Sequence, residues 1–114
     1  MEFQIDRREY TRIPFWYPIT YRLKDHTETH HAFTKNISKG GLLIRTNQTL
    51  PVDTEIELEI FVPELKSNLT IQGKTTWSQE IEANRYYHIG IDFKNLSQKF
   101  QDSIQKLIQT FKLK

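Results

Sequence analysis

Two stretches of polar and apolar alternation constrain what this chain can fold into. In Glu55-Ile-Glu-Leu-Glu-Ile60, every second residue is apolar and glutamates stand between them. The segment 69–77 alternates again, with Leu69, Ile71 and Gly73 on one side. A period of two residues is typical of a β-strand with one buried and one solvated face. The middle of the chain is therefore predicted to be β-sheet.

Further strands are predicted where β-branched and aromatic residues gather. Pro14 and Pro18 confine the first of these strands to a sheet edge or a bend. Polar turn candidates separate the strands at 24–28, around 47–51 and at 80–84. Many short strands divided by turn signals indicate a barrel or a sandwich. The additional strands are expected at 15–23, 30–35, 42–46 and 86–93.

The tail from Leu96 has a different periodicity. Its apolar residues recur at helical spacing, with polar residues between them. We therefore expect a helix over 96–112, with Asn95 or Ser97 as its N-cap. Such a helix covers an open barrel end or an exposed apolar face. The apolar positions are Leu96, Phe100, Ile104, Leu107, Ile108 and Phe111.

Length and composition fit one small domain, predicted to span residues 1–114. A chain of 114 residues can bury one modest core. The absence of cysteine excludes disulfides and permits a reducing cytoplasm, which is the expected location. We expect neither a signal peptide at the start nor a membrane span, which needs about 20 consecutive apolar residues. A net charge of +2 argues against a general nucleic-acid binder.

Three arginines lie close together near the start of the chain, at Arg7, Arg8 and Arg12. A guanidinium is permanently charged, planar and forked, so it can donate two parallel hydrogen bonds to a phosphate or to a guanine edge. Arg8 and Arg12 can reach one ligand whether the segment is a helical turn or a bent loop. Weak surface ion pairs with Asp6 and Glu9 are the alternative interpretation.

A second polar motif follows in Lys35-Asn-Ile-Ser-Lys-Gly-Gly41. Asn36 and Ser38 carry short side chains that bond neighbouring backbone and favour turns. Gly40 and Gly41 permit a positive φ and the close approach of a ligand to the main chain. An ordinary turn between two strands explains the motif equally well.

The two motifs together resemble those of the PilZ domain, the bacterial receptor module for cyclic di-GMP. That family carries Arg-x-x-x-Arg near its start and Asp/Asn-x-Ser-x-x-Gly further along. Segments 73–77 and 88–93 resemble two of its later strands, and a final helix completes the pattern. The residues that match the two motifs are Arg8, Arg12, Asn36, Ser38 and Gly41.

The resemblance implies an all-β fold with a C-terminal helix, built as a six-stranded antiparallel barrel over 15–93. It implies a flexible arginine arm over 1–14, which cyclic di-GMP orders against the barrel to change a surface for a protein partner. Arg7 supports the hypothesis that the ligand binds as a stacked dimer. The implied ligand-binding residues are Arg7, Arg8, Arg12, Asn36, Ser38, Gly40, Gly41 and Trp77.

Several interpretations stay open beside this one. Trp77 either stacks on a ligand base or packs as core at the barrel end, and Arg45 either reaches a phosphate or stays solvated. A PilZ-like module that binds protein without nucleotide is the main alternative function. A barrel for single-stranded nucleic acid is another, although the glutamates of 55–64 argue against the basic stripe it needs.

Neither catalysis nor a resident cofactor or metal is expected. No nucleophile has a base placed beside it by a known motif, so the chain is predicted not to be an enzyme. His26, His30 and His31 lie close in sequence. They fall in a predicted hairpin, where His26 and His30 do not share a face as they would on a helix, so no metal site is predicted.

Overall fold

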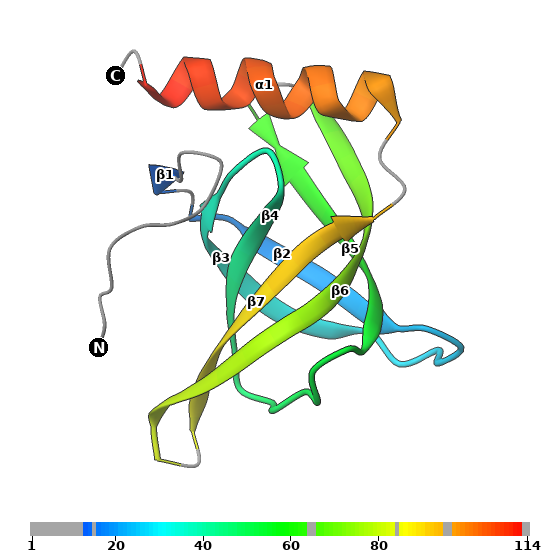
Figure 1. Cartoon of the computed structure of the whole chain (residues 1–114), viewed down its shortest axis with the longest axis vertical. Coiled ribbons are helices and arrows are strands. Elements are labelled where there is room, and N and C mark those ends of the chain that lie inside the picture. The colour runs from blue at the N-terminus through cyan, green and yellow to red at the C-terminus, as the bar shows by residue number, and fades with distance from the viewer. Residues whose placement is uncertain (1–12, 15, 64–65, 84, 95–96, 113–114) are drawn as a thin grey trace.

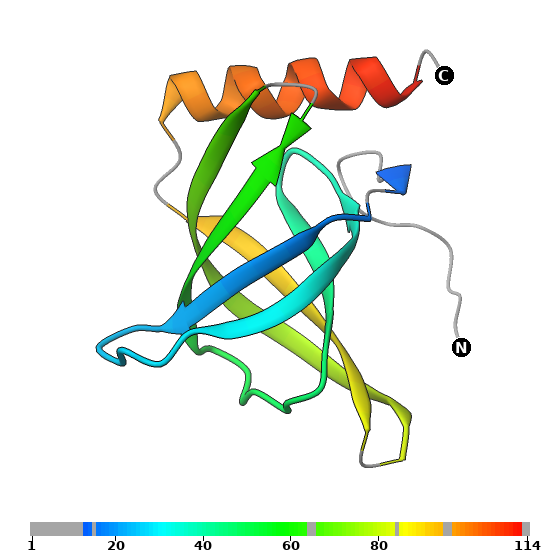
Figure 2. The ribbon, with the colours of Figure 1, turned by 180° about the vertical axis from the view of Figure 1, so that it is seen from behind.

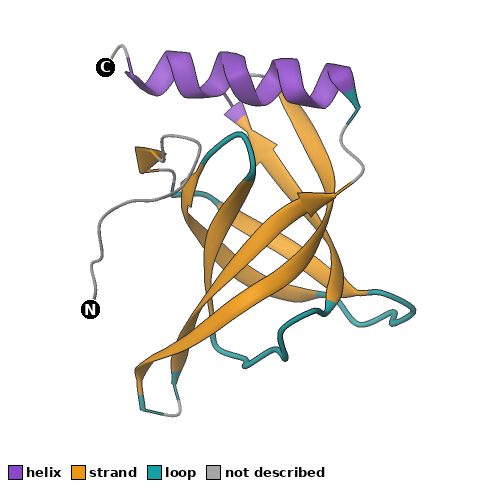
Figure 3. Ribbon diagram, viewed as in Figure 1, coloured by secondary structure: helices purple, strands orange, loops and turns teal. Residues whose placement is uncertain are grey.

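The described residues form seven strands followed by one helix (Figure 3). The computed structural model describes residues 13–14, 16–63, 66–83, 85–94 and 97–112. Residues 1–12 of the predicted arm and Phe15 therefore lie outside the described residues. The elements are β1 (Ile13–Pro14), β2 (Pro18–Leu23), β3 (His30–Ile37), β4 (Gly41–Thr46), β5 (Glu55–Val62), β6 (Ser67–Glu82), β7 (Tyr86–Lys94) and α1 (Gln98–Lys112).

Six of the strands close into a barrel (Figures 1 and 2). Their order is β3-β2-β5-β6-β7-β4, and β4 pairs back with β3 to close the ring. Every pairing is antiparallel. Closure satisfies the backbone hydrogen bonds that free edge strands would leave open. The predicted all-β, six-stranded barrel with a C-terminal helix is confirmed.

The short strand β1 lies outside this ring and pairs with the end of β3. Ile13 is the partner of Ile37, and Pro14 is the partner of Asn36. The pairing of β2 with β3 runs only from Pro18 to Tyr21, opposite Phe33 to His30. β1 therefore continues the sheet on the part of β3 that β2 leaves free, which brings the start of the described chain to the asparagine motif.

Alternating side chains from the strands fill the barrel. On β5, Ile56, Leu58, Ile60 and Val62 are buried, as the glutamate-spaced pattern predicted. Leu69, Ile71 and Gly73 of β6 likewise lie on the buried side. Each buried Leu or Ile side chain contributes about 1.5–3 kcal/mol relative to exposure. The remaining core comes from Ile19, Tyr21, Ala32, Ile37, Leu42, Ile44, Leu50, Ile89, Ile91, Ile104, Leu107 and Ile108.

The helix α1 lies across one end of the barrel (Figure 1). Ile104, Leu107 and Ile108 are buried in the same core as the strands, which is the apolar stripe that the helical spacing predicted. The hydroxyl of Ser97 accepts a hydrogen bond from the Phe100 backbone N–H at 3.1 Å, so Ser97 is the N-cap. The helix thus closes an opening that would otherwise expose the core.

Three predicted boundaries are wrong in informative ways. Asn36 belongs to β3 rather than to the turn that follows it. The strand β6 runs on to Glu82, through most of the predicted turn at 80–84. Pro18 begins β2, which lies between β3 and β5 rather than at an edge. A proline is tolerated there because the first residue of a strand does not need its N–H for the ladder.

Candidate ligand site on the outer barrel wall

The asparagine motif opens onto a wall of the barrel made by β3, β4, β7 and β6. Cross-strand partners project from the same side of a sheet, so the register defines which side chains are neighbours. One row across this wall contains Asn36, Leu43, Gly90 and Trp77. The next row contains Phe33, Arg45, His88 and Gln79. We call these two rows, together with Lys35, the site wall.

An irregularity in β3 places two consecutive polar residues on the site wall. The register with β4 shifts between Thr34 and Asn36, so Lys35 is an extra residue. Thr34 and Ile37 are both fully buried, whereas Lys35 and Asn36 between them are only partly buried. A β-bulge of this kind re-aims side chains and is over-represented beside functional sites. Lys35 and Asn36 consequently both face outward.

A second irregularity in β6 does the same for Trp77. The register with β7 shifts between Thr75 and Trp77. Leu69, Ile71, Gly73 and Thr75 are buried in alternation, which without a shift would turn residue 77 inward. Trp77 instead is 39% exposed. The interpretation of Trp77 as a core residue at the barrel end is therefore wrong, and its stacking on a ligand base stays a prediction.

The indole of Trp77 lies directly over Gly90. A Cβ at Gly90 would come within 2.2 Å of the indole Nε1, so only glycine accommodates the ring there. The ring therefore leans from β6 across β7, toward the asparagine side of the wall. With neighbouring strands about 4.8 Å apart, Asn36 lies only roughly 10 Å from the strand that the indole covers. One flat ligand can therefore contact both Asn36 and the indole of Trp77.

The turn after Asn36 is held by Ser38. Its side chain is 4% exposed. The hydroxyl donates to the Gly41 carbonyl at 3.3 Å and accepts from the Gly40 N–H at 3.3 Å. The Ser38 N–H also donates to the Gly41 carbonyl at 2.9 Å. These bonds form the local turn that the motif predicted. The hydroxyl of Ser38 is therefore engaged in hydrogen bonds within the turn.

The two glycines serve this turn differently from what the sequence suggested. None of the chain's glycines has a positive φ, so the turn does not use the positive φ that Gly40 and Gly41 permit. A Cβ at Gly41 would lie 2.2 Å from the Ile91 carbonyl oxygen. Gly41 is thus required for β4 to pack against β7. The Gly40 carbonyl accepts from the Phe93 N–H at 3.0 Å, which ties the turn to the same strand.

Positive charges on the site wall lie beside aromatic rings. The Lys35 Nζ is 5.3 Å from the centre of the Trp16 ring, and the Arg45 guanidinium carbon is 4.4 Å from the centre of the Tyr86 ring. Among the described residues, no carboxylate forms an ion pair with Lys35 or Arg45. Burial lowers the pKa of His88, and the nearby charges of Lys35 and Arg45 lower it further.

An apolar hollow borders this part of the wall. It has a volume of about 530 Å³ and is lined by Trp16, Phe33, Arg45 and Tyr86, together with neighbouring residues. Trp16 and Phe33 are 55% and 53% exposed. Exposed rings next to cations without a carboxylate partner among the described residues suit a ligand that combines flat bases with negative charge, because rings stack on bases and cations bind phosphates.

The predicted site residues divide into two groups. Asn36, Ser38, Gly40 and Gly41 lie together at the end of β3 and the start of β4, and Trp77 faces the same wall two strands away. Lys35 and His88 were missed. The sequence did contain a signal for His88. It precedes Ile89 and Ile91, whose alternating burial places His88 on the outer face of the strand. The arginines of the predicted site, Arg7, Arg8 and Arg12, lie outside the described residues.

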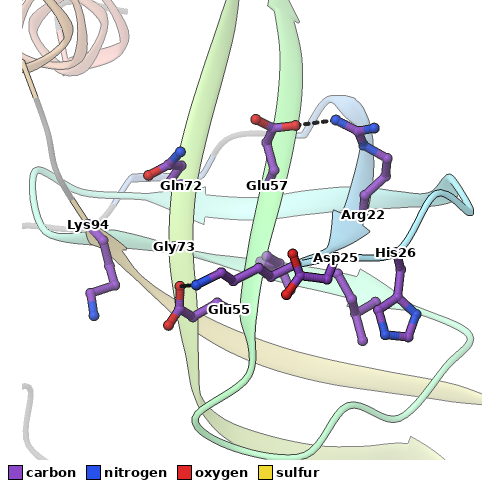
Figure 4. Close-up of a pocket in the computed structure, with 11 residues that line it drawn as sticks. Arg22, Asp25, His26, Glu55, Glu57, Gln72, Gly73 and Lys94 are labelled. Atoms are coloured by element: carbon purple, nitrogen blue, oxygen red, sulfur yellow. Dashed lines mark hydrogen bonds and ion pairs between the residues drawn. The ribbon is translucent and has the colours of Figure 1, made fainter.

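A larger hollow lies on another wall, formed by β2, β5 and β6 (Figure 4). Its volume is about 620 Å³. Four of the charged residues that line it are paired within the wall, Arg22 with Glu57 and Lys24 with Glu55. Over the described part of the chain, no three His, Cys, Asp or Glu side chains are grouped to hold a metal ion. The described helix also lacks the length and apolar character of a membrane span.

A family model described as the PilZ domain matches residues 6–110. This chain belongs to the PilZ family. The match covers nearly all of the sequence and includes both polar motifs. PilZ domains are a ligand-binding family rather than an enzyme family. A comparison with curated proteins finds no significant match.

Solved structures share the fold of this PilZ domain. The inhibitor of motility MotI/DgrA of Bacillus subtilis has a TM-score of 0.79 at 15% identity, with 96% of this chain and 52% of that chain covered. The PilZ domain of YcgR from Escherichia coli, with c-di-GMP, has a TM-score of 0.73 at 17% identity, with coverages of 92% and 91%. The K. pneumonia MrkH–c-di-GMP complex has a TM-score of 0.77 at 21% identity, with coverages of 96% and 54%. This chain thus spans about half the length of MotI/DgrA and of MrkH.

Proposed function

We propose that this PilZ domain is a cytoplasmic, non-enzymatic receptor for cyclic di-GMP. The pairing of β1 with β3 is the observation that carries the proposal. Ile13 and Pro14 lie opposite Ile37 and Asn36. The segment that follows the arginines in sequence is therefore paired with the asparagine motif. Arg12 is bonded to Ile13, and consecutive Cα atoms are about 3.8 Å apart. The described chain therefore starts beside the site wall, and Arg12 directly precedes it in sequence.

Each part of the site then has a role. Arg8 and Arg12 bind phosphates and guanine edges, and Arg7 adds charge or stacking. Asn36 bonds a guanine, with Ser38 holding the turn that presents it. The indole of Trp77 provides a surface on which a base stacks.

Ligand binding also explains why three arginines are placed together. Arg7, Arg8 and Arg12 repel one another until an anion neutralises them. Two phosphates supply that charge and draw the arm against the barrel, an order–disorder switch of a known kind. The surface next to β1 then changes, and a protein partner distinguishes the two states. The structures of MrkH and of the YcgR PilZ domain with c-di-GMP support the proposal by analogy of fold.

Competition binding tests the proposal. A fluorescent cyclic di-GMP analogue should bind the protein and be displaced by unlabelled cyclic di-GMP, but not by GTP or by a single-stranded oligonucleotide. Displacement by the oligonucleotide instead would favour the nucleic-acid alternative. If the analogue does not bind even at concentrations far above cellular levels, the chain is better explained as a PilZ-like module that binds protein without nucleotide. The titration endpoint also tests the stacked dimer, which requires two ligands per chain.

A further inference from the structure

Three basic side chains from three different strands lie close together on the site wall. Lys35 comes from the bulge in β3, Arg45 from β4 and His88 from β7. Arg45 and His88 are direct cross-strand partners. Such a group of like charges is unfavourable unless something negative joins it. Among the described residues, no carboxylate pairs with Lys35 or Arg45.

Few other charged residues lie around His88 in the part of the chain that the structure describes. On β6 its partner is Gln79, which does not titrate. On its own strand, Tyr86 and Gly90 share its face, with Asp92 two residues beyond Gly90. Arg85 lies near the Tyr86 ring, at 5.8 Å from its centre, and adds a further positive charge. The charges that act on the imidazole are those of Lys35 and Arg45.

We infer that Lys35, Arg45 and His88 form a second phosphate subsite on the barrel wall, separate from the arm arginines, and that His88 takes up a proton when the phosphate binds. This inference rests on the proposed function. Arg45 and His88 stand in the row next to that of Asn36 and Trp77, and Lys35 directly precedes Asn36 on β3. A ligand held between those two residues therefore carries one of its phosphates over them.

The proton uptake follows from the charges. In the free protein, burial and two neighbouring cations keep the pKa of His88 below its ordinary value, so the imidazole is mostly neutral at pH 7. A bound phosphate offsets Lys35 and Arg45 and raises the pKa of His88. Between the free and the bound pKa, binding takes up a proton. Affinity is then highest at low pH and falls as the pH rises through that window.

Calorimetric titration with cyclic di-GMP at pH 5.5, 6.5 and 8.0 tests this inference. One unit of pKa change corresponds to a tenfold change in affinity, so the wild type should weaken by about threefold to tenfold over the range. The phosphodiesters are not expected to titrate there. The variant His88→Gln keeps a polar side chain that cannot be protonated, and its affinity should not vary with pH. His26→Gln, in the β2–β3 hairpin, is the matched control and should behave as the wild type.

A spectroscopic measurement locates the proton. The imidazole resonances of His88, followed by NMR against pH, should titrate at a higher pH when cyclic di-GMP is saturating. In Arg45→Ala without ligand, the same titration should also move upward because one repulsive charge is gone. Binding that is independent of pH and leaves the His88 titration unmoved would overturn this inference alone. Failure to bind at every pH would overturn the proposed function, and this inference with it.

Discussion

Two walls of the same barrel differ in how their charged side chains are paired. The wall of β2, β5 and β6 keeps a regular register and pairs Arg22 with Glu57 and Lys24 with Glu55 (Figure 4). The strands of the site wall have three register shifts, one between β3 and β4 and two between β6 and β7, and its cations lie over aromatic rings without carboxylate partners among the described residues. The polar pairs around β2, β5 and β6 are Arg22–Glu57, Lys24–Glu55, Lys74–Asp53 and Asn68–Glu59.

The difference in charge pairing supports the site wall as the proposed anion-binding surface. Where each cation already has a carboxylate, an anionic ligand must displace that partner and gains little. Where cations face rings instead, a phosphate provides the first full countercharge. The larger hollow therefore belongs to the less suitable wall, and volume alone is a poor guide to the site. Matched substitutions on the two walls can break or sharpen this comparison.

The largest effect is expected for Arg12→Ala. Loss of one or two charge-assisted hydrogen bonds, each worth about 1.5–3 kcal/mol, should weaken cyclic di-GMP binding by roughly tenfold to a few hundredfold. The melting temperature should change little. Arg22→Ala removes an arginine of the paired wall and should leave the affinity within about twofold of the wild type. Calorimetry that finds equal affinity for Arg12→Ala and the wild type would reject the arm as the ligand clamp.

Trp77→Ala should have the next largest effect on binding. Stacking of a base on an aromatic side chain is worth about 1–3 kcal/mol, so the affinity should fall by roughly fivefold to a hundredfold. Phe61→Ala is the matched control, since Phe61 is an exposed ring on β5. If both variants bind as well as the wild type in fluorescence titration, the indole only covers Gly90 and no base stacks on it.

Gly41→Ala should affect folding rather than binding chemistry. The added methyl would meet the Ile91 carbonyl oxygen, and overpacking of this kind costs about 1–3 kcal/mol. The melting temperature should fall by about 4–8 °C for each kcal/mol lost. Gly40→Ala is the control, because no comparable clash is found there among the described residues. Thermal unfolding without ligand that gives the same midpoint for both variants would show that β4 can move to accept a side chain.

The alternating patterns predicted the barrel well because burial on one face specifies a strand by itself. The glutamate-spaced strand β5 and the helix with its Ser97 cap are both found as expected. The site was harder to predict because it depends on two bulges. A bulge changes the side to which every later residue points, as it does for Trp77, and a single sequence carries no local signal for it.

The asparagine motif also shows what a single sequence cannot reveal about a site. The turn chemistry of Ser38 was readable from residue type, and the hydrogen bonds agree with it. The need for glycine at position 41 arises from the carbonyl oxygen of Ile91, fifty residues later, and not from a positive φ. Contacts between distant segments decide such positions.

A smaller effect is expected on the paired wall. A double-mutant cycle of Arg22→Ala and Glu57→Gln should give a coupling of about 0.2–1 kcal/mol, because exposed ion pairs are weak. The coupling should shrink in 1 M salt, where the screening length falls to about 3 Å. Urea unfolding measures it. A coupling well above this range would show that the paired wall is preorganised more strongly than its exposure indicates.

The smallest effect concerns His88 in the free protein. Its pKa is lowered in the folded state, so the unfolded chain binds the proton more readily. Its contribution to stability is therefore present above the unfolded pKa of about 6.5 and is lost as the pH falls toward the folded pKa. Urea unfolding between pH 5 and 7.5 should show a shallower dependence on pH for His88→Gln than for the wild type. Arg45→Ala should also flatten it, since one cause of the lowered pKa is removed. Equal slopes in all three proteins would mean that the cations of the site wall do not act on His88, and the contrast between the two walls would then lose its electrostatic basis.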